Sequence, residues 1–265
     1  MLSCRPAQCA PVLLVLTALG GCTPREVPIV ETQGECGAMY SARICTWARM
    51  RGDSVIDIGA MVPVASIESA PHDAEMAWPP APVTALALPP AAQASTGLTH
   101  MTVFWESMGH PPGPYLTPHF DFHFYTIGQD QRLAMDCADL SKPAELAAGY
   151  TLPDVALPPP MAAMIGTSML TGLCVPQMGM HSLLSSEMES TGLFRGTMVI
   201  GYYQGKPIFI EPMITKEMLL EQKAFELPIP AIPGLAGNRP RAFRAEFDTA
   251  QKAYRFVFSD FTAGM

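Results

Sequence analysis

Pro118-His119-Phe120-Asp121-Phe122-His123-Phe124-Tyr125 is the stretch of sequence that indicates the fold most clearly. Successive side chains of a β-strand point to opposite faces, so the three phenylalanines share one face, and the histidines, Asp121 and Tyr125 share the other. The aromatic face suits a hydrophobic core, which would fix the register of the strand. We therefore expect a strand with one packing face and one face of potential metal ligands.

The rest of the chain is also predicted to be mainly β, as a single β-sandwich or barrel-like domain with Pro-rich loops and a few short helices. Short apolar or alternating runs lie between Gly, Pro and Asp; the predicted strands are 44–51, 54–64, 83–88, 98–106, 120–127, 197–203, 207–211, 242–247 and 254–259. The turn at 203–206 predicts a hairpin, because Gly205 accepts a positive φ. Helical periodicity is limited to 142–148 and 216–225.

The composition excludes several classes of protein. A chain of 265 residues with 49% hydrophobic and 15% charged residues suits one large or two small domains and excludes a coiled coil. A net charge of −8 disfavours nucleic acid as a partner. The motifs of serine hydrolases, zincin proteases, and dinucleotide- or phosphate-binding enzymes are absent from the sequence. The oligomeric state stays open, with a homo-oligomer among the alternatives.

The N-terminus is typical of an exported lipoprotein. Residues 1–21 hold one charge, Arg5, then a short apolar run, and Gly20-Gly21 precede Cys22, as in a bacterial lipobox. We predict a lipoprotein signal peptide at 1–21, lipidation of Cys22, a tether over 22–34 and a β-rich domain over 35–265. The protein would then be anchored by lipid in the bacterial cell envelope, facing the periplasm or in the outer membrane. An ordinary secretory peptide or an uncleaved anchor are the alternatives.

The cysteines of the mature chain are even in number. Cys36, Cys45, Cys137 and Cys174 remain once the signal peptide and the lipidated cysteine are set aside. In an oxidising compartment this favours two disulfides, and the most local pairing joins Cys36 to Cys45 and Cys137 to Cys174. Four buried free thiols are the alternative.

A cluster of potential metal ligands is the main indication of function. The candidate ligands are His119, Asp121, His123, His181 and Glu211. His181 ends a loop at 175–181, and Glu211 lies among apolar strand residues, where a carboxylate is costly unless it is paired or metal-bound. Imidazoles with carboxylates suit zinc, which we expect first, or iron, manganese, nickel or copper.

Strand geometry limits which residues can share an ion. Side chains two residues apart on a strand are ~6.6 Å apart at Cα, and those four apart are ~13 Å apart. His119 with Asp121, or Asp121 with His123, is therefore the easier pair, and Asp121 could instead orient a ligating imidazole. A common ion also requires ring nitrogens of His123 and His181 within ~8 Å of each other.

Other interpretations of this cluster remain open at this stage. A buried hydrogen-bond network without an ion is one of them. Copper binding is another, because Met178 and Met180 precede His181 and thioethers are soft ligands. His110 and Tyr125 are additional candidates for the site, whereas His72 and His100 are interpreted as surface or structural residues.

The sequence resembles a family of uncharacterised exported bacterial proteins and lipoproteins. The shared motifs are a Gly-His-x-Pro lead at His110, the block at 118–125, a Val-Pro-x-Met-Gly-x-His loop at 175–181 and a hairpin at 201–213. The resemblance implies a mainly β domain behind an export signal, and it transfers no activity. The chain is also similar to cupins, which place His-x-His on a barrel strand, although here Asp121 separates the two histidines and the following glutamate of cupins is absent.

Two functions follow from these features. The first is an exported lipoprotein that binds or senses a divalent metal through the ligand cluster. The second is a cupin-like, metal-dependent enzyme acting on a small molecule, with Tyr125 or Glu211 as the group that transfers a proton. A copper-binding envelope protein is a narrower form of the first function.

Overall fold

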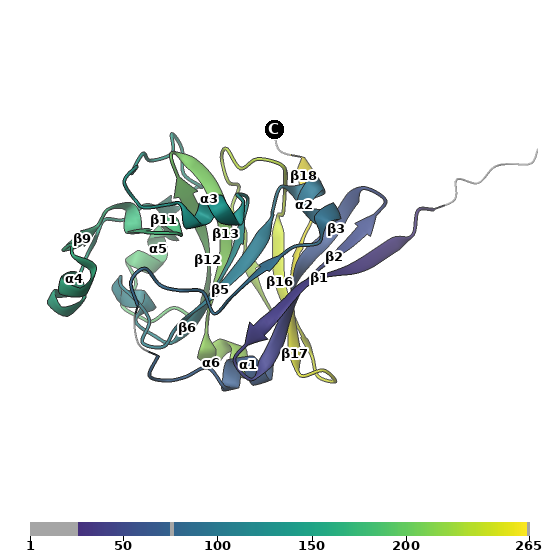
Figure 1. Cartoon of the computed structure of the whole chain (residues 1–265), viewed down its shortest axis with the longest axis horizontal. Helices are drawn as coiled ribbons and strands as arrows, with labels where there is room; N and C mark the ends of the chain where they lie inside the picture. The colour runs from purple at the N-terminus through teal and green to yellow at the C-terminus, as the bar shows by residue number, and fades with distance from the viewer. Residues whose placement is uncertain (1–25, 75–76, 264–265) are drawn as a thin grey trace, which may run out of the picture.

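The computed structural model of the protein describes residues 26–74 and 77–263. The predicted signal peptide at 1–21 and the predicted lipidation site, Cys22, lie outside these residues. The described chain forms two antiparallel sheets that pack on each other, with short helices at their edges (Figure 1). The predicted fold class, a mainly β, sandwich-like domain, is confirmed.

The first sheet is built from both ends of the described chain. Its six strands follow the order β1-β2-β3-β17-β16-β14. Their bounds are β1 Ile29–Met39, β2 Ala42–Arg51, β3 Ser54–Pro63, β14 Phe225–Pro228, β16 Ala242–Asp248 and β17 Ala253–Ser259. Hydrogen bonds between β3 and β17 therefore join the N-terminal and C-terminal strands into one sheet.

The second sheet contains the strand predicted at 118–125. Its order is β10-β11-β12-β13-β6-β5-β4, and β7 pairs with β11. The bounds are β4 Thr84–Ala87, β5 His100–Glu106, β6 His119–Tyr125, β7 Tyr150–Thr151, β10 Cys174–Val175, β11 Gly179–Leu184, β12 Gly196–Tyr203 and β13 Lys206–Thr215. Two small pairs complete the strands: β8 Val155–Ala156 with β9 Met169–Leu170, and β15 Asn238–Arg239 with β18 Thr262–Ala263.

The helices are all short. They are α1 Val64–Glu68, α2 Pro90–Thr96, η1 Gly113–Tyr115, α3 Gln129–Leu133, α4 Pro159–Ile165, η2 Thr171–Leu173, α5 Ser185–Met188 and α6 Lys216–Leu220. α2 and α4 begin at a proline, whose missing N–H would have no partner in the first turn, and end at a left-handed glycine. Within the described residues, no helix has the length and apolarity needed to cross a membrane.

The two faces of β6 have the predicted division of roles. Phe122 and Phe124 point into the core between the sheets, where their rings lie 4.9 and 4.8 Å from Phe256 and Phe258 of β17. The opposite face of the second sheet is covered by connecting segments, which include the small β8–β9 pair. Apolar residues of those segments form a second cluster on this face, which includes Tyr115, Val155, Leu157, Leu170, Leu173 and Phe194.

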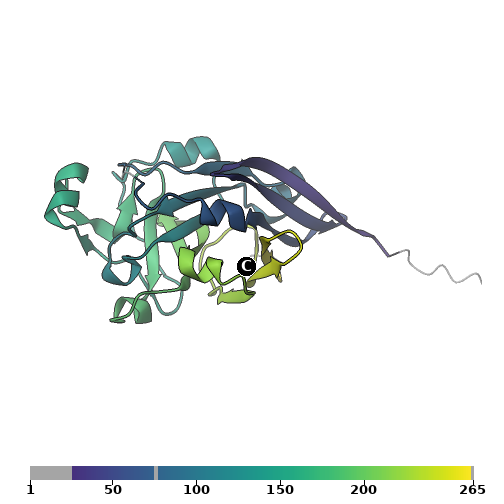
Figure 2. The ribbon, with the colours of Figure 1, turned by 90° about the horizontal axis from the view of Figure 1, so that it is seen from below.

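The sequence predicted no strand before residue 44, and β1 was therefore missed. β1 starts at Ile29, so residues 29–34 of the predicted tether belong to the sheet. These residues are mostly exposed, and their strand conformation comes from main-chain pairing with β2, from Ile29 opposite Arg51 to Met39 opposite Ala42. Figures 1 and 2 show this end of β1 at the opposite end of the molecule from α4.

The helix predicted at 142–148 is wrong, and the one at 216–225 is shorter than predicted. Pro143 lacks an N–H, and the segment is held by main-chain bonds from Gly205 to Ser141 and from Tyr150 to Ala147. The helix that begins at Lys216 ends at Leu220, because residues 225–228 pair with β16 as β14. The predicted hairpin at 203–206 is present between β12 and β13, with φ of 51° at Gln204 and 70° at Gly205.

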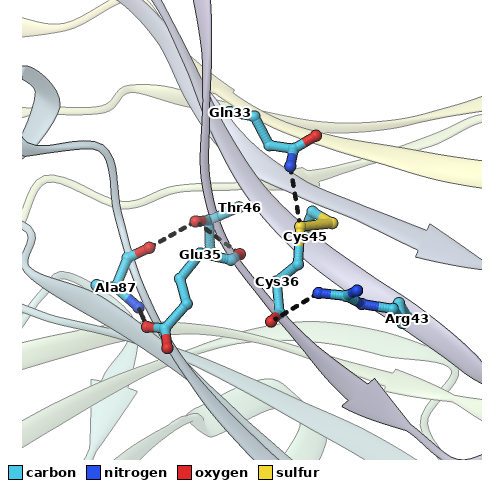
Figure 3. The surroundings of a disulfide bond; sticks show 7 residues. All are labelled: Gln33, Glu35, Cys36, Arg43, Cys45, Thr46 and Ala87. Atoms are coloured by element: carbon cyan, nitrogen blue, oxygen red, sulfur yellow. Dashed lines mark hydrogen bonds between the residues drawn. A yellow bond between two sulfur atoms is a disulfide. The ribbon is translucent and has the colours of Figure 1, made fainter.

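Both predicted disulfides are confirmed. Cys36–Cys45 joins β1 to β2, and Cys137–Cys174 joins the segment after α3 to β10, the neighbour of β11. Figure 3 shows how the first disulfide lies where the two sheets meet. Ala87 of β4 donates its N–H to the carboxylate of Glu35 (2.8 Å) and accepts a bond from the hydroxyl of Thr46 (2.6 Å). The β1–β2 hairpin is thereby attached to the edge of the second sheet.

Candidate metal centre

The candidate ligands gather on the outer face of the second sheet, away from the core between the sheets. β6, β13 and β11 contribute them, and β12 lies between β13 and β11. His181 pairs with Gly201 of β12, which in turn pairs with Phe209 of β13. A Cβ at Gly201 would lie 1.8 Å from the Phe209 ring, so only glycine leaves room for that ring. The Phe209 ring packs against His123 and His181, with centroids 4.6 and 5.2 Å away.

The first group of ligands consists of His123, His181 and Glu211. Their ligand atoms all lie within 4.8 Å of one another. The Nε2 atoms of His123 and His181 are 3.4 Å apart, and His123 Nε2 is 3.5 Å from Glu211 Oε2. Two ligands of a tetrahedral ion with ~2.1 Å bonds are ~3.4 Å apart. The two measured separations therefore match those of ligands around one ion, and the sequence-based limit of ~8 Å for the two histidines is met.

The second group consists of His110, His119 and Asp121. Its ligand atoms also lie within 4.8 Å of one another, and His119 Nε2 is 3.3 Å from Asp121 Oδ1. The rings of His110 and His119 meet edge to face at 4.8 Å. His119 lies on β6, whereas His110 comes from the Gly-Pro-rich loop that precedes η1.

The structure thus divides the predicted ligand set into two groups. His119 and Asp121 pair with each other, as the strand spacing favoured, and His123 belongs with the downstream residues His181 and Glu211. His110, an additional candidate, joins His119 and Asp121. Tyr125 belongs to neither group: its ring stacks on His100 at 5.0 Å and on His123 at 5.6 Å. His181 lies on β11 rather than in a loop, because Gln177 and Gly179 adopt positive φ and turn the chain into a hairpin.

Main-chain carbonyl groups fix the orientation of three imidazoles. Nδ1 of His181 lies 3.0 Å from the main-chain oxygen of Leu173. Nδ1 of His119 lies 2.7 Å from the oxygen of Thr117, and Nδ1 of His110 lies 2.9 Å from that of Pro111. A carbonyl oxygen only accepts hydrogen bonds, so Nδ1 carries the proton and Nε2 keeps its lone pair. Metal-binding histidines commonly have this arrangement, in which the ring nitrogen that does not bind the metal donates its proton to a carbonyl or carboxylate.

Burial keeps the imidazoles of His119, His123 and His181 neutral. It lowers the pKa of His181 to about 4 and holds the pKa values of His119 and His123 well below the usual value. Burial also raises the pKa of Asp121 and of Glu211, and neighbouring carboxyls add to both effects. Neutral imidazoles are the form that binds metal, and carboxyls buried together need either protons or a cation.

Several polar atoms at the centre have no hydrogen-bond partner. They include His119 Nε2, Asp121 Oδ1, His123 Nδ1, Glu211 Oε2 and the hydroxyl of Tyr125. His119 is 0% exposed, Asp121 5% and Glu211 1%. A buried polar atom without a partner costs ~1–3 kcal/mol. Several such atoms in one place therefore indicate a bound ion or molecule that would pair with them.

A pocket opens onto both groups. Its cavity is about 80 Å³ and reaches the side chains of His110, Asp121, His181 and Glu211. The walls are mostly apolar and come largely from 157–178; they include Trp78, Leu157, Met161, Ile165, Leu170, Leu173, Val175 and Met178. The pocket therefore combines a polar floor with apolar walls, as small-molecule sites do.

Sequence reasoning missed Glu106. It lies directly opposite His119 in the β5–β6 register, half-buried, and lines the pocket. Burial raises its pKa, and the neighbouring His110 partly offsets that rise. The sequence showed that Glu106 ends a predicted strand. It could not show that Glu106 lies opposite His119, because that depends on the β5–β6 register. Of the two methionines considered for copper, Met178 lines the pocket, whereas Met180 is buried in the core between the sheets.

The comparisons with known proteins give no independent indication of function. No protein-family model matches the chain, and no curated protein or solved structure is similar enough to match it. The functional argument therefore depends on the geometry of the two ligand groups and of the pocket above them.

Proposed function

We propose that the protein is an exported lipoprotein that binds a divalent transition metal through His123, His181 and Glu211. The observation that carries this proposal is the spacing of the ligand atoms, 3.4 and 3.5 Å. A hydrogen-bond network explains it less well, because Glu211 Oε2 then stays buried without a partner. Two imidazoles and one carboxylate make a ligand set found in zinc sites, and zinc is the metal we expect first.

Export and lipidation are supported by the N-terminal sequence and by the disulfides. The Gly20-Gly21-Cys22 pattern follows a short apolar segment. The two disulfides are typical of proteins outside the reducing cytosol. We propose attachment to the bacterial cell envelope by lipid on Cys22, with the β domain facing the periplasm. Mass spectrometry of the mature N-terminus tests this part, and an unmodified, uncleaved chain would contradict it.

Metal analysis tests the proposed centre. Protein purified without chelators and measured by inductively coupled plasma mass spectrometry is expected to contain bound metal. Glu211→Gln and His181→Ala should each remove the ion from this centre, because either change leaves two protein ligands. His100→Gln is the matched control, since His100 is also buried on this face of the sheet but belongs to neither ligand group. Metal-free protein that binds no added Zn²⁺ would refute the proposal.

A second candidate function is catalysis at the same centre. Three protein ligands leave at least one position of a tetrahedral ion open, and catalytic zinc sites share this feature. His181 and Glu211 line the pocket, whose apolar walls would hold a small molecule beside an ion bound there. Glu106 lines the same pocket and is the half-buried carboxyl suited to proton transfer, whereas Tyr125 does not line it.

The open position can be tested without knowing the substrate. Co²⁺ substituted for Zn²⁺ reports its coordination in the visible spectrum, and added acetohydroxamate should change that spectrum by binding at the open position. An unchanged spectrum would indicate a closed set of ligands and would favour binding or sensing over catalysis.

A further inference from the structure

We infer that the pocket holds two divalent metal ions, the second bound by His110, His119 and Asp121. This inference rests on the proposed metal-binding function and extends it to a second site. Members of both ligand groups line one pocket, His110 and Asp121 from one group and His181 and Glu211 from the other. Each group combines residues of β6 with residues of different neighbouring segments.

The second group has ligand geometry of its own. His119 Nε2 and Asp121 Oδ1 are 3.3 Å apart, close to the ~3.4 Å between two ligands of a tetrahedral ion. Both atoms are buried, and neither has a hydrogen-bond partner. Since main-chain carbonyls hold the Nδ1 protons of His110 and His119, the Nε2 lone pair of His119 faces a carboxylate oxygen. Two electron-rich atoms in this position repel each other unless a cation or a proton lies between them.

One shared ion does not fit all six residues. Two ligands of one ion with ~2.2 Å bonds lie at most ~4.4 Å apart, and the ligand atoms form two separate groups. His119 and His123, which belong to different groups, are four residues apart on β6, or ~13 Å at Cα, too far for both to reach one ion easily. Two ions side by side therefore match the strand repeat, whereas one ion does not.

The charge of the pocket also favours two ions. Glu106, Asp121 and Glu211 all line this one pocket. Among residues 26–74 and 77–263, no Lys or Arg forms an ion pair with any of them. One divalent ion balances two carboxylates, and the third would remain uncompensated in a largely apolar pocket. Glu106, opposite His119 in the register, is the fourth ligand available to the second ion.

The competing explanation is a proton in place of the second ion. A protonated Asp121 could donate to His119 Nε2, although 3.3 Å is long for an O–H donor. The two explanations differ in the number of ions that the chain binds.

Metal stoichiometry decides between them. Full-length protein is stripped with a chelator, equilibrated with Zn²⁺ and measured for zinc per chain; we expect two ions. Asp121→Asn, which keeps the shape of the side chain, and His110→Ala, at a half-buried loop position, should each leave one ion. Glu211→Gln should also leave one, and His100→Gln should leave two. Circular dichroism checks that each variant is folded, and the His110 variant covers the case in which Asp121→Asn does not fold.

The outcomes separate the two proposals. One ion per chain that survives Asp121→Asn and His110→Ala but is lost in Glu211→Gln would overturn the second ion and leave the first centre intact. One ion that every ligand variant removes would show a single shared site and would also overturn the two-ion centre. No ion in the wild type would refute both proposals. Two anomalous scattering peaks at the zinc edge in crystals of the loaded protein would confirm the pair.

Discussion

The inner and outer faces of β6 place chemically opposite residues on one strand. On the inner face, Phe122 and Phe124 contact aromatic rings of the other sheet and contain no polar side-chain atom. On the outer face, Asp121 and His119 present buried atoms without hydrogen-bond partners. The inner face buries apolar rings, which favours folding, whereas buried polar atoms without partners on the outer face carry an energetic cost. The difference indicates that the outer face is maintained for binding rather than for folding.

The largest expected effect is on the inner face. Phe122→Ala should lower the free energy of unfolding by ~3–5 kcal/mol, because it leaves a cavity in a core that cannot close around it. Denaturation with urea measures the loss. The loss of unfolding free energy caused by Phe122→Ala should be the same with and without Zn²⁺, because the inner face does not contact the ligands. A loss below ~1 kcal/mol would mean that the two sheets do not depend on this ring.

Metal should stabilise the protein through the outer face. Zn²⁺ at one hundred times its dissociation constant stabilises a one-site protein by ~2.7 kcal/mol, because the ion binds the folded state alone. Thermal denaturation with and without chelator measures this effect. Glu211→Gln should reduce it, whereas Phe122→Ala should retain it. An equal response to Zn²⁺ in wild type and in variants of both ligand groups would indicate binding elsewhere.

Gly201→Ala tests the support beneath the ligands. The added methyl group meets the Phe209 ring, which packs on His123 and His181. We expect a loss of stability of ~1–3 kcal/mol from overpacking, together with weaker Zn²⁺ binding. Isothermal titration calorimetry measures the affinity. Gly192→Ala, at an exposed position where an added Cβ meets only the Ser190 hydroxyl at 3.6 Å, is the control and should leave affinity unchanged.

The smallest effect should have the opposite sign. In metal-free protein at neutral pH, Glu211→Gln should leave the free energy of unfolding unchanged or raise it by ~1 kcal/mol. Burial raises the pKa of Glu211 in the folded state, so its ionised form is less favourable there than in the unfolded chain. Removing the carboxylate removes that penalty, and urea denaturation in the presence of chelator measures the change. A clear loss of stability would show that Glu211 has a structural partner.

The sequence predicted what depends on local pattern. Alternation along 118–125 assigned Phe122 and Asp121 to opposite faces, because the period of a strand is independent of its neighbours. The same pattern could not group His110 with His119, which depends on how the Pro-rich loop before η1 returns to the strand. Nor could it place Glu106, because its position opposite His119 is set by the β5–β6 register.

The missed strands show a related limit. β1 contains polar and glycine residues and is held by pairing with β2, so its own sequence has little strand pattern. β11 was predicted as a loop ending in His181, because glycine and proline precede it. In both cases the neighbouring strand supplies the conformation, and a single strand's composition does not show it.

The carbonyl groups at Pro111, Thr117 and Leu173 set the ring state of three histidines. Every amino acid has such a group, so these hydrogen bonds depend on the path of the main chain and not on the side chains at the three positions. Relatives of this domain could therefore keep the same chemistry while diverging widely in the residues beside it. A shared backbone trace around three histidines would then reveal kinship better than residue identity would.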